Sequence, residues 1–194
     1  MTVFATQLQQ RVETSGSSLC VGLDPHRPDL PAPTAAAARD WCLSLVRQTA
    51  PYAAAFKPNA AFFEVFGAEG WTALHQVIEE IRTVSATAGS HIPVILDAKR
   101  GDIASTAEAY AAAAFEGLGA DIITLSPYLG ADSIEPFVRN PERGAFVLCK
   151  TSNPGSGDLQ DVPVQTSTGV RPLYIHTAEL AQRWTPHHNV GLVV

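Results

Sequence analysis

The sequence predicts an α/β fold with a parallel sheet, and we expect a single domain over residues 1–194. Six short apolar segments alternate with longer segments of helical periodicity. No hairpin signal links one apolar segment to the next, so the strands should run parallel. Polar residues follow nearly every apolar segment, which favours a (β/α)8 barrel over an open sheet with one ligand-binding crevice.

The expected strands are short apolar runs, and the run at 92–96 is typical of a strand buried on both faces. They lie at residues 18–23, 53–56, 92–96, 121–125, 145–149 and 190–194. A complete barrel needs about 250 residues, so we expect an incomplete one, with about six of the eight strands present and the C-terminal βα units missing. Two strand edges would then be unpaired, and we expect poor solubility or aggregation.

The expected helices follow the strands. Residues 35–49 are alanine-rich and come after Thr34, a suitable N-cap, and residues 68–88 carry an apolar stripe at helical spacing. The other helices are expected at 104–118, 133–139 and 173–184. Residues 152–172 have little apolar periodicity and directly follow a strand, so we expect a long loop that acts as a lid.

Composition narrows the function. The net charge of −6 argues against a nucleic-acid partner. No segment approaches the length of a membrane span, and the N-terminus has no signal-peptide pattern, so a cytoplasmic location is expected. The three cysteines lack metal-ligand spacing, and Cys20 and Cys149 lie in apolar runs where we expect buried, reduced thiols.

The segment from Asp97 to Asp102 is the most informative part of the chain. Asp97 and Lys99 are two residues apart at the end of an expected strand, so both should point to one face, whereas Asp102 lies beyond Gly101. A carboxylate beside an ammonium group suits chemistry that expels one anion and protonates another. An ion pair that merely caps the strand is the alternative interpretation.

Five motifs lie at the expected strand ends. They are Val21-Gly22-Leu23-Asp24-Pro25, Phe56-Lys57-Pro58-Asn59, Asp97-Ala98-Lys99-Arg100-Gly101-Asp102-Ile103 with Thr106, Thr124-Leu125-Ser126-Pro127-Tyr128-Leu129-Gly130, and Lys150-Thr151-Ser152-Asn153-Pro154-Gly155. In this order, the five motifs together resemble those of the orotidine 5′-phosphate decarboxylase family, and of its longer bacterial subfamily in particular.

The resemblance implies a catalytic role for four residues. Lys99 would deliver a proton to C6 of the pyrimidine as carbon dioxide leaves, and Asp97 would face the substrate carboxylate. Lys57 would tie the charged groups together. Asp102 would enter the site of the partner subunit in a homodimer.

The resemblance also implies substrate-binding residues. Ile103 and Thr106 would accompany Asp102 across the dimer interface. Asp24 would contact a ribose hydroxyl, Ser152 would contact the pyrimidine ring, and Asn59 is expected among the same group. The implied substrate is orotidine 5′-phosphate, and the family needs no metal and no organic cofactor. Its phosphate-binding residues would lie beyond Val194.

Two alternatives remain open at this point. A magnesium-dependent sugar-phosphate decarboxylase or aldolase of the same superfamily would also have a DxKxxD strand end, although Lys57 stands where a metal site would favour a carboxylate. An inactive, truncated remnant would carry the same motifs and perform no chemistry.

Overall fold

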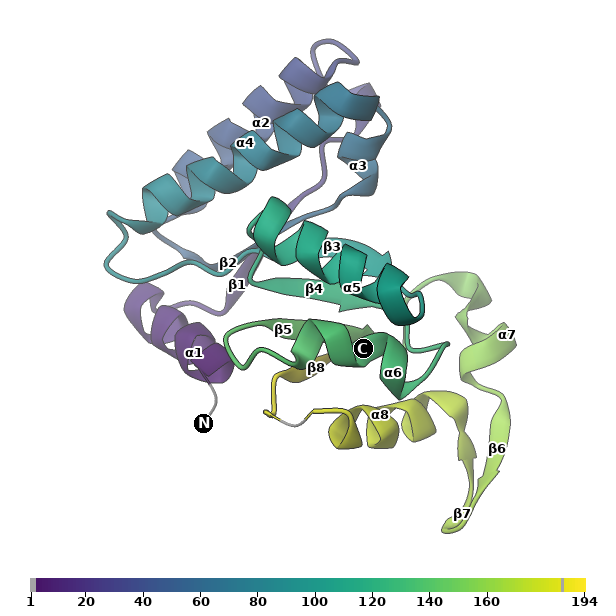
Figure 1. The fold of residues 1–194 in the computed structure, drawn as a ribbon. Coiled ribbons are helices and arrows are strands. Elements are labelled where there is room, and N and C mark those ends of the chain that lie inside the picture. Colours follow the sequence, from purple (N-terminus) through teal and green to yellow (C-terminus); the bar gives the residue numbers. More distant parts are fainter. Residues whose placement is uncertain (1–2, 186) are drawn as a thin grey trace.

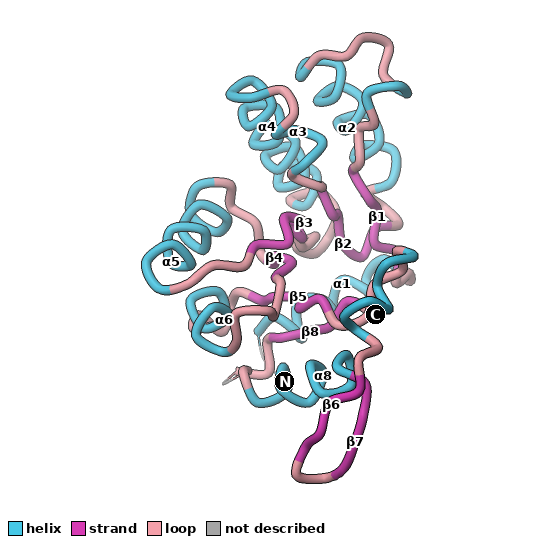
Figure 2. The backbone as a smooth tube through the Cα atoms, turned by 90° about the vertical axis from the view of Figure 1, so that its right-hand side faces the viewer, coloured by secondary structure: helices cyan, strands magenta, loops and turns pink. Residues whose placement is uncertain are grey.

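Six parallel strands form the centre of the computed structural model, which describes residues 3–185 and 187–194. One sheet pairs β1 (Leu19–Leu23) with β2 (Ala53–Pro58), and a second orders β3 (Ile95–Arg100), β4 (Ile122–Leu125), β5 (Gly144–Leu148) and β8 (Val190–Val193). Single bridges from Phe56 to Val94 and from Asn59 to Asp97 join the two sheets. The strands therefore follow one another in chain order along an arc (Figure 2). The six predicted strands and their parallel direction are confirmed.

Helices cover the outer side of this arc (Figures 1 and 2). They are α2 (Ala35–Thr49), α3 (Ala61–Glu64), α4 (Gly67–Ser85), α5 (Ala104–Ala112), α6 (Ala131–Val138) and α8 (Leu173–Arg183). A π-helical turn, Ala113–Gly117, extends α5, and a 3-10 turn, Arg27–Asp29, follows β1. Strand followed by outer helix, repeated along the chain, is the arrangement of part of a (β/α)8 barrel.

The main core lies between the strands and the outer helices. The apolar stripe of α4 is wholly buried there, as its periodicity predicted: Leu74, Val77, Ile78 and Ile81 each have no exposed surface. Thr34 caps α2 by accepting a hydrogen bond from the Ala37 amide at 3.2 Å. Capping satisfies an amide that has no partner inside the helix.

The sequence did not predict the short helix α3, nor the longer helix that precedes β1. Helix α1 (Val3–Ser15) precedes β1 and is held by the buried Arg11 guanidinium, which is 1% exposed. Arg11 donates to the carbonyls of Ala50 at 2.6 Å, Ala53 at 2.8 Å and Ala88 at 3.1 Å. A buried charge is tolerated where hydrogen bonds replace its hydration, so polar contacts hold α1 where an apolar stripe would be expected.

The predicted long loop at 152–172 is wrong. The segment contains a 3-10 turn (Pro154–Ser156), the short helix α7 (Gly157–Gln160) and an antiparallel hairpin of β6 (Pro163–Thr166) and β7 (Gly169–Pro172). The expectation that no hairpin is present also fails. The hairpin turn is Ser167-Thr168, which lacks the Asn-Gly or Asp-Gly signal of common two-residue turns.

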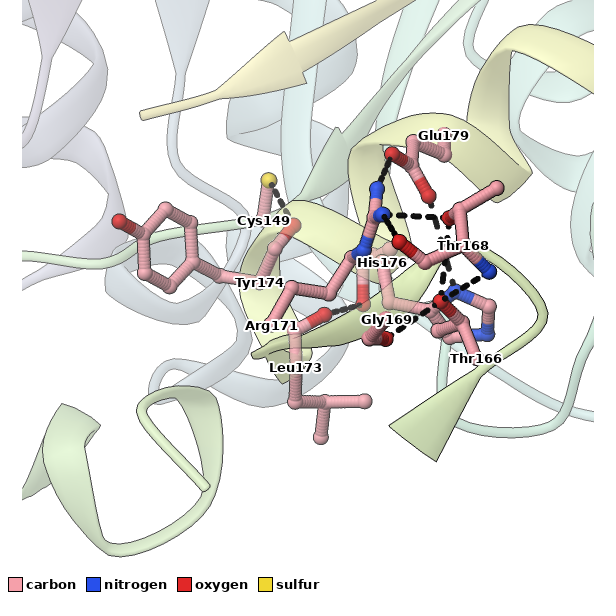
Figure 3. A network of polar contacts seen from close by, with 10 residues as sticks. Cys149, Thr166, Thr168, Gly169, Arg171, Leu173, Tyr174, His176 and Glu179 are labelled. Atoms are coloured by element: carbon pink, nitrogen blue, oxygen red, sulfur yellow. Dashed lines mark hydrogen bonds and ion pairs between the residues drawn. The ribbon is translucent and has the colours of Figure 1, made fainter. Parts of the chain in front are cut away.

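Polar contacts fix this hairpin against α8 (Figure 3). Arg171 of β7 forms an ion pair with Glu179 of α8 and a hydrogen bond with the Thr168 hydroxyl. Thr166 donates to the carbonyl of Gly169 at 2.7 Å, which closes the turn. The segment is therefore a docked substructure with its own hydrogen bonds.

The cysteine prediction is half right. Cys149 is buried and donates from Sγ to the Tyr174 carbonyl, 3.1 Å away, whereas Cys20 is exposed. Val21 and Leu23 point toward the helices and are buried, so strand alternation turns Cys20 to the opposite, inner face of the arc. An apolar run predicts a strand, but it does not say that both faces of that strand are covered.

Candidate active site

The site is built on a bulge in β3. Leu96 pairs with Ile123 of β4, but the next pair joins Arg100 to Leu125, so three residues of β3 stand opposite Thr124 alone. Lys99 has a backbone φ of 47°, in the left-handed region that non-glycine residues rarely adopt. Asp97 and Lys99 therefore lie inside β3 and not beyond its end, and an irregular backbone brings them together where the sequence predicted simple alternation.

Asp97 lies between two lysines. Its Oδ1 is 2.6 Å from Nζ of Lys99, and its Oδ2 is 3.1 Å from Nζ of Lys57 on β2. The Asp97 side chain is 9% exposed, whereas those of Lys57 and Lys99 are 33% and 50% exposed. The arrangement is a nearly buried carboxylate that holds two ammonium groups at the edge of solvent.

The charge on Asp97 is stabilised by its neighbours. Burial opposes ionisation and is the largest single influence on this carboxyl, but hydrogen bonds from Lys99, Lys57 and Thr124 and the charge of Lys57 together outweigh it. The pKa of Asp97 is therefore lower than its ordinary value. At neutral pH the group is an anion between two cations.

Two further candidates, Asp24 and Asn59, lie just after the ends of adjacent strands. Asp24 follows β1, which pairs with β2 so that Gly22 stands beside Lys57. The Asn59 amide donates to the Leu23 carbonyl at 3.2 Å, and Asn59 forms a bridge with Asp97. Asp24, Lys57, Asn59 and Asp97 thus lie on three neighbouring strands at one end of the arc.

The Cys20 thiol, on the inner face of β1, is influenced by the charges of Lys57 and Asp24. Desolvation by the surrounding protein raises its pKa, while the charge of Lys57 lowers it and that of Asp24 raises it. Lys57 and Asp24 are therefore close enough to Cys20 for both charges to act on it.

The remaining predicted residues lie apart from this cluster. In the described ranges, Asp102 forms no ion pair with either lysine, and its Oδ1 instead accepts a hydrogen bond from the Ile103 amide at 2.8 Å. Ile103 is 53% exposed, and Thr106 is also exposed. Ser152 follows β5 and is exposed on the segment that carries α7. Within this one chain the structure does not bring these four residues to Asp97.

Sequence reasoning missed a role for Thr124. This residue is 4% exposed, and its hydroxyl contacts Asp97 and the backbone of the bulge. The available signal was a lone hydroxyl within the apolar run 122–125. Such a group needs hydrogen-bond partners when it is buried.

Gly101, directly after β3, lets the backbone pack closely against Ser126. A Cβ at this position would meet Cβ of Ser126 at 3.1 Å, and the Ser126 amide donates to the Arg100 carbonyl at 2.7 Å. Arg100 also pairs with Glu64 of α3 at 2.5 Å and lies 5.0 Å from the Tyr110 ring. These contacts position the turn that leads to Asp102.

The positive charge in this site comes from lysine side chains. No cluster of three or more His, Cys, Asp or Glu side chains suited to a metal ion occurs in the part of the chain that the structure describes. The cation beside Asp97 is supplied by Lys57 and Lys99, so the magnesium-dependent alternative gains no support from the geometry.

Comparison with known proteins identifies the family of the chain. The model of the orotidine 5′-phosphate decarboxylase / HUMPS family matches residues 17–194. The chain belongs to this family. The resemblance carried by the five sequence motifs is thereby confirmed.

Curated relatives in the family are identical to this chain at about half of the aligned positions. The chain is 51% identical over 197 residues to an orotidine 5′-phosphate decarboxylase of Roseiflexus sp. (strain RS-1), covering 100% of this chain and 66% of the relative. It is 52% identical to that of Roseiflexus castenholzii, covering 92% of this chain and 63% of the relative. The chain therefore spans slightly less than two thirds of the length of these two proteins.

Solved structures show the same fold. Leishmania donovani OMP decarboxylase superposes with a TM-score of 0.85 at 53% identity, covering all of this chain and 70% of that one. A Toxoplasma gondii orotidine-monophosphate-decarboxylase, described as putative, gives 0.88 at 40% identity, covering 98% and 70%. The prediction of a (β/α)8 barrel with about six strands present is confirmed. No helix in the described ranges is long and apolar enough to cross a membrane.

Proposed function

We propose that this protein decarboxylates orotidine 5′-phosphate to uridine 5′-phosphate without a metal or an organic cofactor. The observation that carries the proposal is the pairing of buried Asp97 with Lys57 and Lys99, at 3.1 and 2.6 Å. The relatives named as orotidine 5′-phosphate decarboxylases support it. The free state of Cys20, Cys42 and Cys149 fits the cytoplasmic location expected from the sequence.

Asp97, Lys57 and Lys99, which we call the lysine array, match the charge changes of this reaction. The bond between C6 and the substrate carboxylate breaks, its electron pair stays on C6, and carbon dioxide leaves. The proton that then joins C6 comes from Nζ of Lys99, whose side chain is half exposed. An ammonium about 4 Å from the developing carbanion stabilises it by about 4 kcal/mol at an effective dielectric of about 20.

Asp97 contributes in two ways to the proposed reaction. It holds the Lys99 ammonium in place before substrate arrives, so little reorganisation is needed as charge develops. Its own negative charge would face the substrate carboxylate, and that repulsion is relieved when carbon dioxide departs. The two ion pairs and the Thr124 hydrogen bond keep this carboxylate ionised while nearly buried.

We further propose that the complete site forms in a homodimer, with Asp102 of each subunit reaching the lysine array of the other. Asp102 is not paired with Lys57 or Lys99 in the described chain, and Ile103 beside it is 53% exposed. An exposed apolar side chain beside a carboxylate that forms no ion pair with the lysines of its own chain suits a subunit interface.

The first experiment measures the loss of orotidine 5′-phosphate absorbance with the purified 194-residue chain and with its Lys99→Ala variant. We expect turnover that falls by about 10²–10⁴-fold in the variant, the range of a lost general acid. Circular dichroism should be unchanged, because the Lys99 side chain is half exposed. Equal turnover in both would refute Lys99 as the proton donor. A folded chain without turnover would refute the activity for these residues and favour the inactive remnant.

The shared site is tested by mixing Lys99→Ala with Asp102→Ala chains after each is shown to be inactive. Mixed dimers would contain one intact site, so about a quarter of the original sites should recover activity in an equimolar mixture. No recovery, with dimers present by light scattering, would refute the sharing of Asp102.

A further inference from the structure

The bulge in β3 leaves backbone donors that β4 cannot satisfy with its own carbonyls. Between the pairs Leu96–Ile123 and Arg100–Leu125, three residues of β3 face Thr124 alone. The amides of Ala98 and Lys99 lie in this interval. Buried amides without a partner are costly, so this stretch needs an acceptor from elsewhere.

The Thr124 side chain supplies that acceptor. Its Oγ1 accepts hydrogen bonds from the Ala98 amide at 3.0 Å and the Lys99 amide at 2.9 Å. Lys99 is held in the left-handed backbone region at a φ of 47°. Such a conformation persists only where the surroundings stabilise it.

The same hydroxyl also orients the carboxylate. It donates a hydrogen bond to Oδ1 of Asp97 at 2.9 Å. The same carboxylate oxygen lies 2.6 Å from Nζ of Lys99. A threonine hydroxyl offers one donor and two acceptor positions, and all three are used here. The β-branched side chain has a restricted χ1 angle, which keeps the oxygen in this place.

We infer that Thr124 is a positioning residue that sets the geometry of Lys99 and Asp97 through one hydroxyl group. The inference rests on the proposed function for its effect on catalysis, whereas the backbone effect stands on the bulge alone. Thr124 touches the two charged residues and the backbone between them, and it acts on the reaction through them.

The structural test compares Thr124→Val, which keeps the shape and removes the hydroxyl, with Thr124→Ser, which keeps the hydroxyl. Amide hydrogen exchange by NMR is read at Ala98 and Lys99. We expect exchange at both amides to rise about fivefold to tenfold in the valine variant, because each amide loses one hydrogen bond of ordinary strength. The serine variant should remain within a few-fold of the original protein.

A matched control is Thr49→Val, because the Thr49 hydroxyl also makes a hydrogen bond, to the Leu45 carbonyl of α2 at 2.8 Å, outside this site. It should leave exchange at Ala98 and Lys99 unchanged. Unchanged exchange in Thr124→Val would overturn the inference. If the valine variant does not fold, Thr124→Ala, which also lacks an acceptor, replaces it, and slow exchange at both amides in that variant would overturn the inference equally.

The catalytic test separates kcat from KM. A shift of Lys99 by about 1 Å costs on the order of 100-fold in rate, so Thr124→Val should lower kcat strongly with KM changed little, and Thr124→Ser should restore most of it. A valine variant with normal kcat would overturn the catalytic part. If the original chain shows no turnover, the proposed function has failed, and the exchange experiment still decides the role of Thr124.

Discussion

Replacing Asp97 with asparagine removes the central charge of the lysine array while keeping the shape of the side chain. The two ion pairs, at 3.1 and 2.6 Å, correspond to about 5 and about 6 kcal/mol of Coulomb attraction at an effective dielectric of about 20. Most of this is offset, because burying the carboxylate costs several kcal/mol and both lysines keep contact with water. We expect a net loss of about 1–2 kcal/mol in unfolding free energy at pH 7 for Asp97→Asn.

The pH dependence identifies the source of this loss. The pKa of Asp97 is lowered by folding, so its contribution is fully present above the ordinary carboxyl pKa of about 4. It is lost as the pH falls through the lower pKa of the folded state, because the protonated carboxyl and the asparagine are then both neutral. The stability difference between the two proteins should therefore be constant from pH 7 to about 5 and shrink below about 4.

The assay is urea denaturation of both proteins at several pH values. Asp161→Asn serves as the control, because Asp161 forms an ion pair with Lys150 at 2.6 Å but its side chain is 53% exposed. That pair should contribute less than about 1 kcal/mol. A difference for Asp97→Asn that is no larger than that of the control, or that persists unchanged at low pH, would refute the electrostatic account. Turnover should fall even where Asp97→Asn is fully folded, because the asparagine cannot hold Lys99 by charge.

Three further substitutions, one of them with a control, test the scaffold. Arg11→Met should lower the unfolding free energy by about 3–5 kcal/mol, because three backbone carbonyls, two of them in buried hydrogen bonds, lose their donor. The control Arg39→Met, at a position where the side chain is 33% exposed, should change it by less than about 0.5 kcal/mol in the same urea experiment. Thr34→Ala should cost about 1 kcal/mol through loss of the α2 cap, and a melting temperature equal to the original would contradict that role. Arg100→Met should cost about 1 kcal/mol and speed proteolysis of the turn after β3, since it removes the ion pair with Glu64; an unchanged cleavage rate would exclude a role in ordering that turn.

The sequence predicted well those elements whose apolar residues are buried between the sheet and the helices. Apolar runs marked all six strands of the arc, and helical spacing marked the covered face of α4. Helix α1 was missed because buried Arg11 holds it by hydrogen bonds to backbone carbonyls, which leave no local pattern. The β6–β7 hairpin was missed because its turn lacks glycine in the two central positions and neither strand contains a buried residue.

For the site, the sequence alone assigned Lys57 to one strand and Asp97 and Lys99 to the next, and so predicted that they meet toward the carboxyl end of a parallel sheet. Only the tertiary structure decided how they meet, through a register shift against β4 and a left-handed backbone at Lys99. It also decided that Asp102 lies apart from the array and that Thr124 supports it. The positions of strands along the chain follow from local periodicity, whereas a bulge depends on pairing between residues more than twenty positions apart.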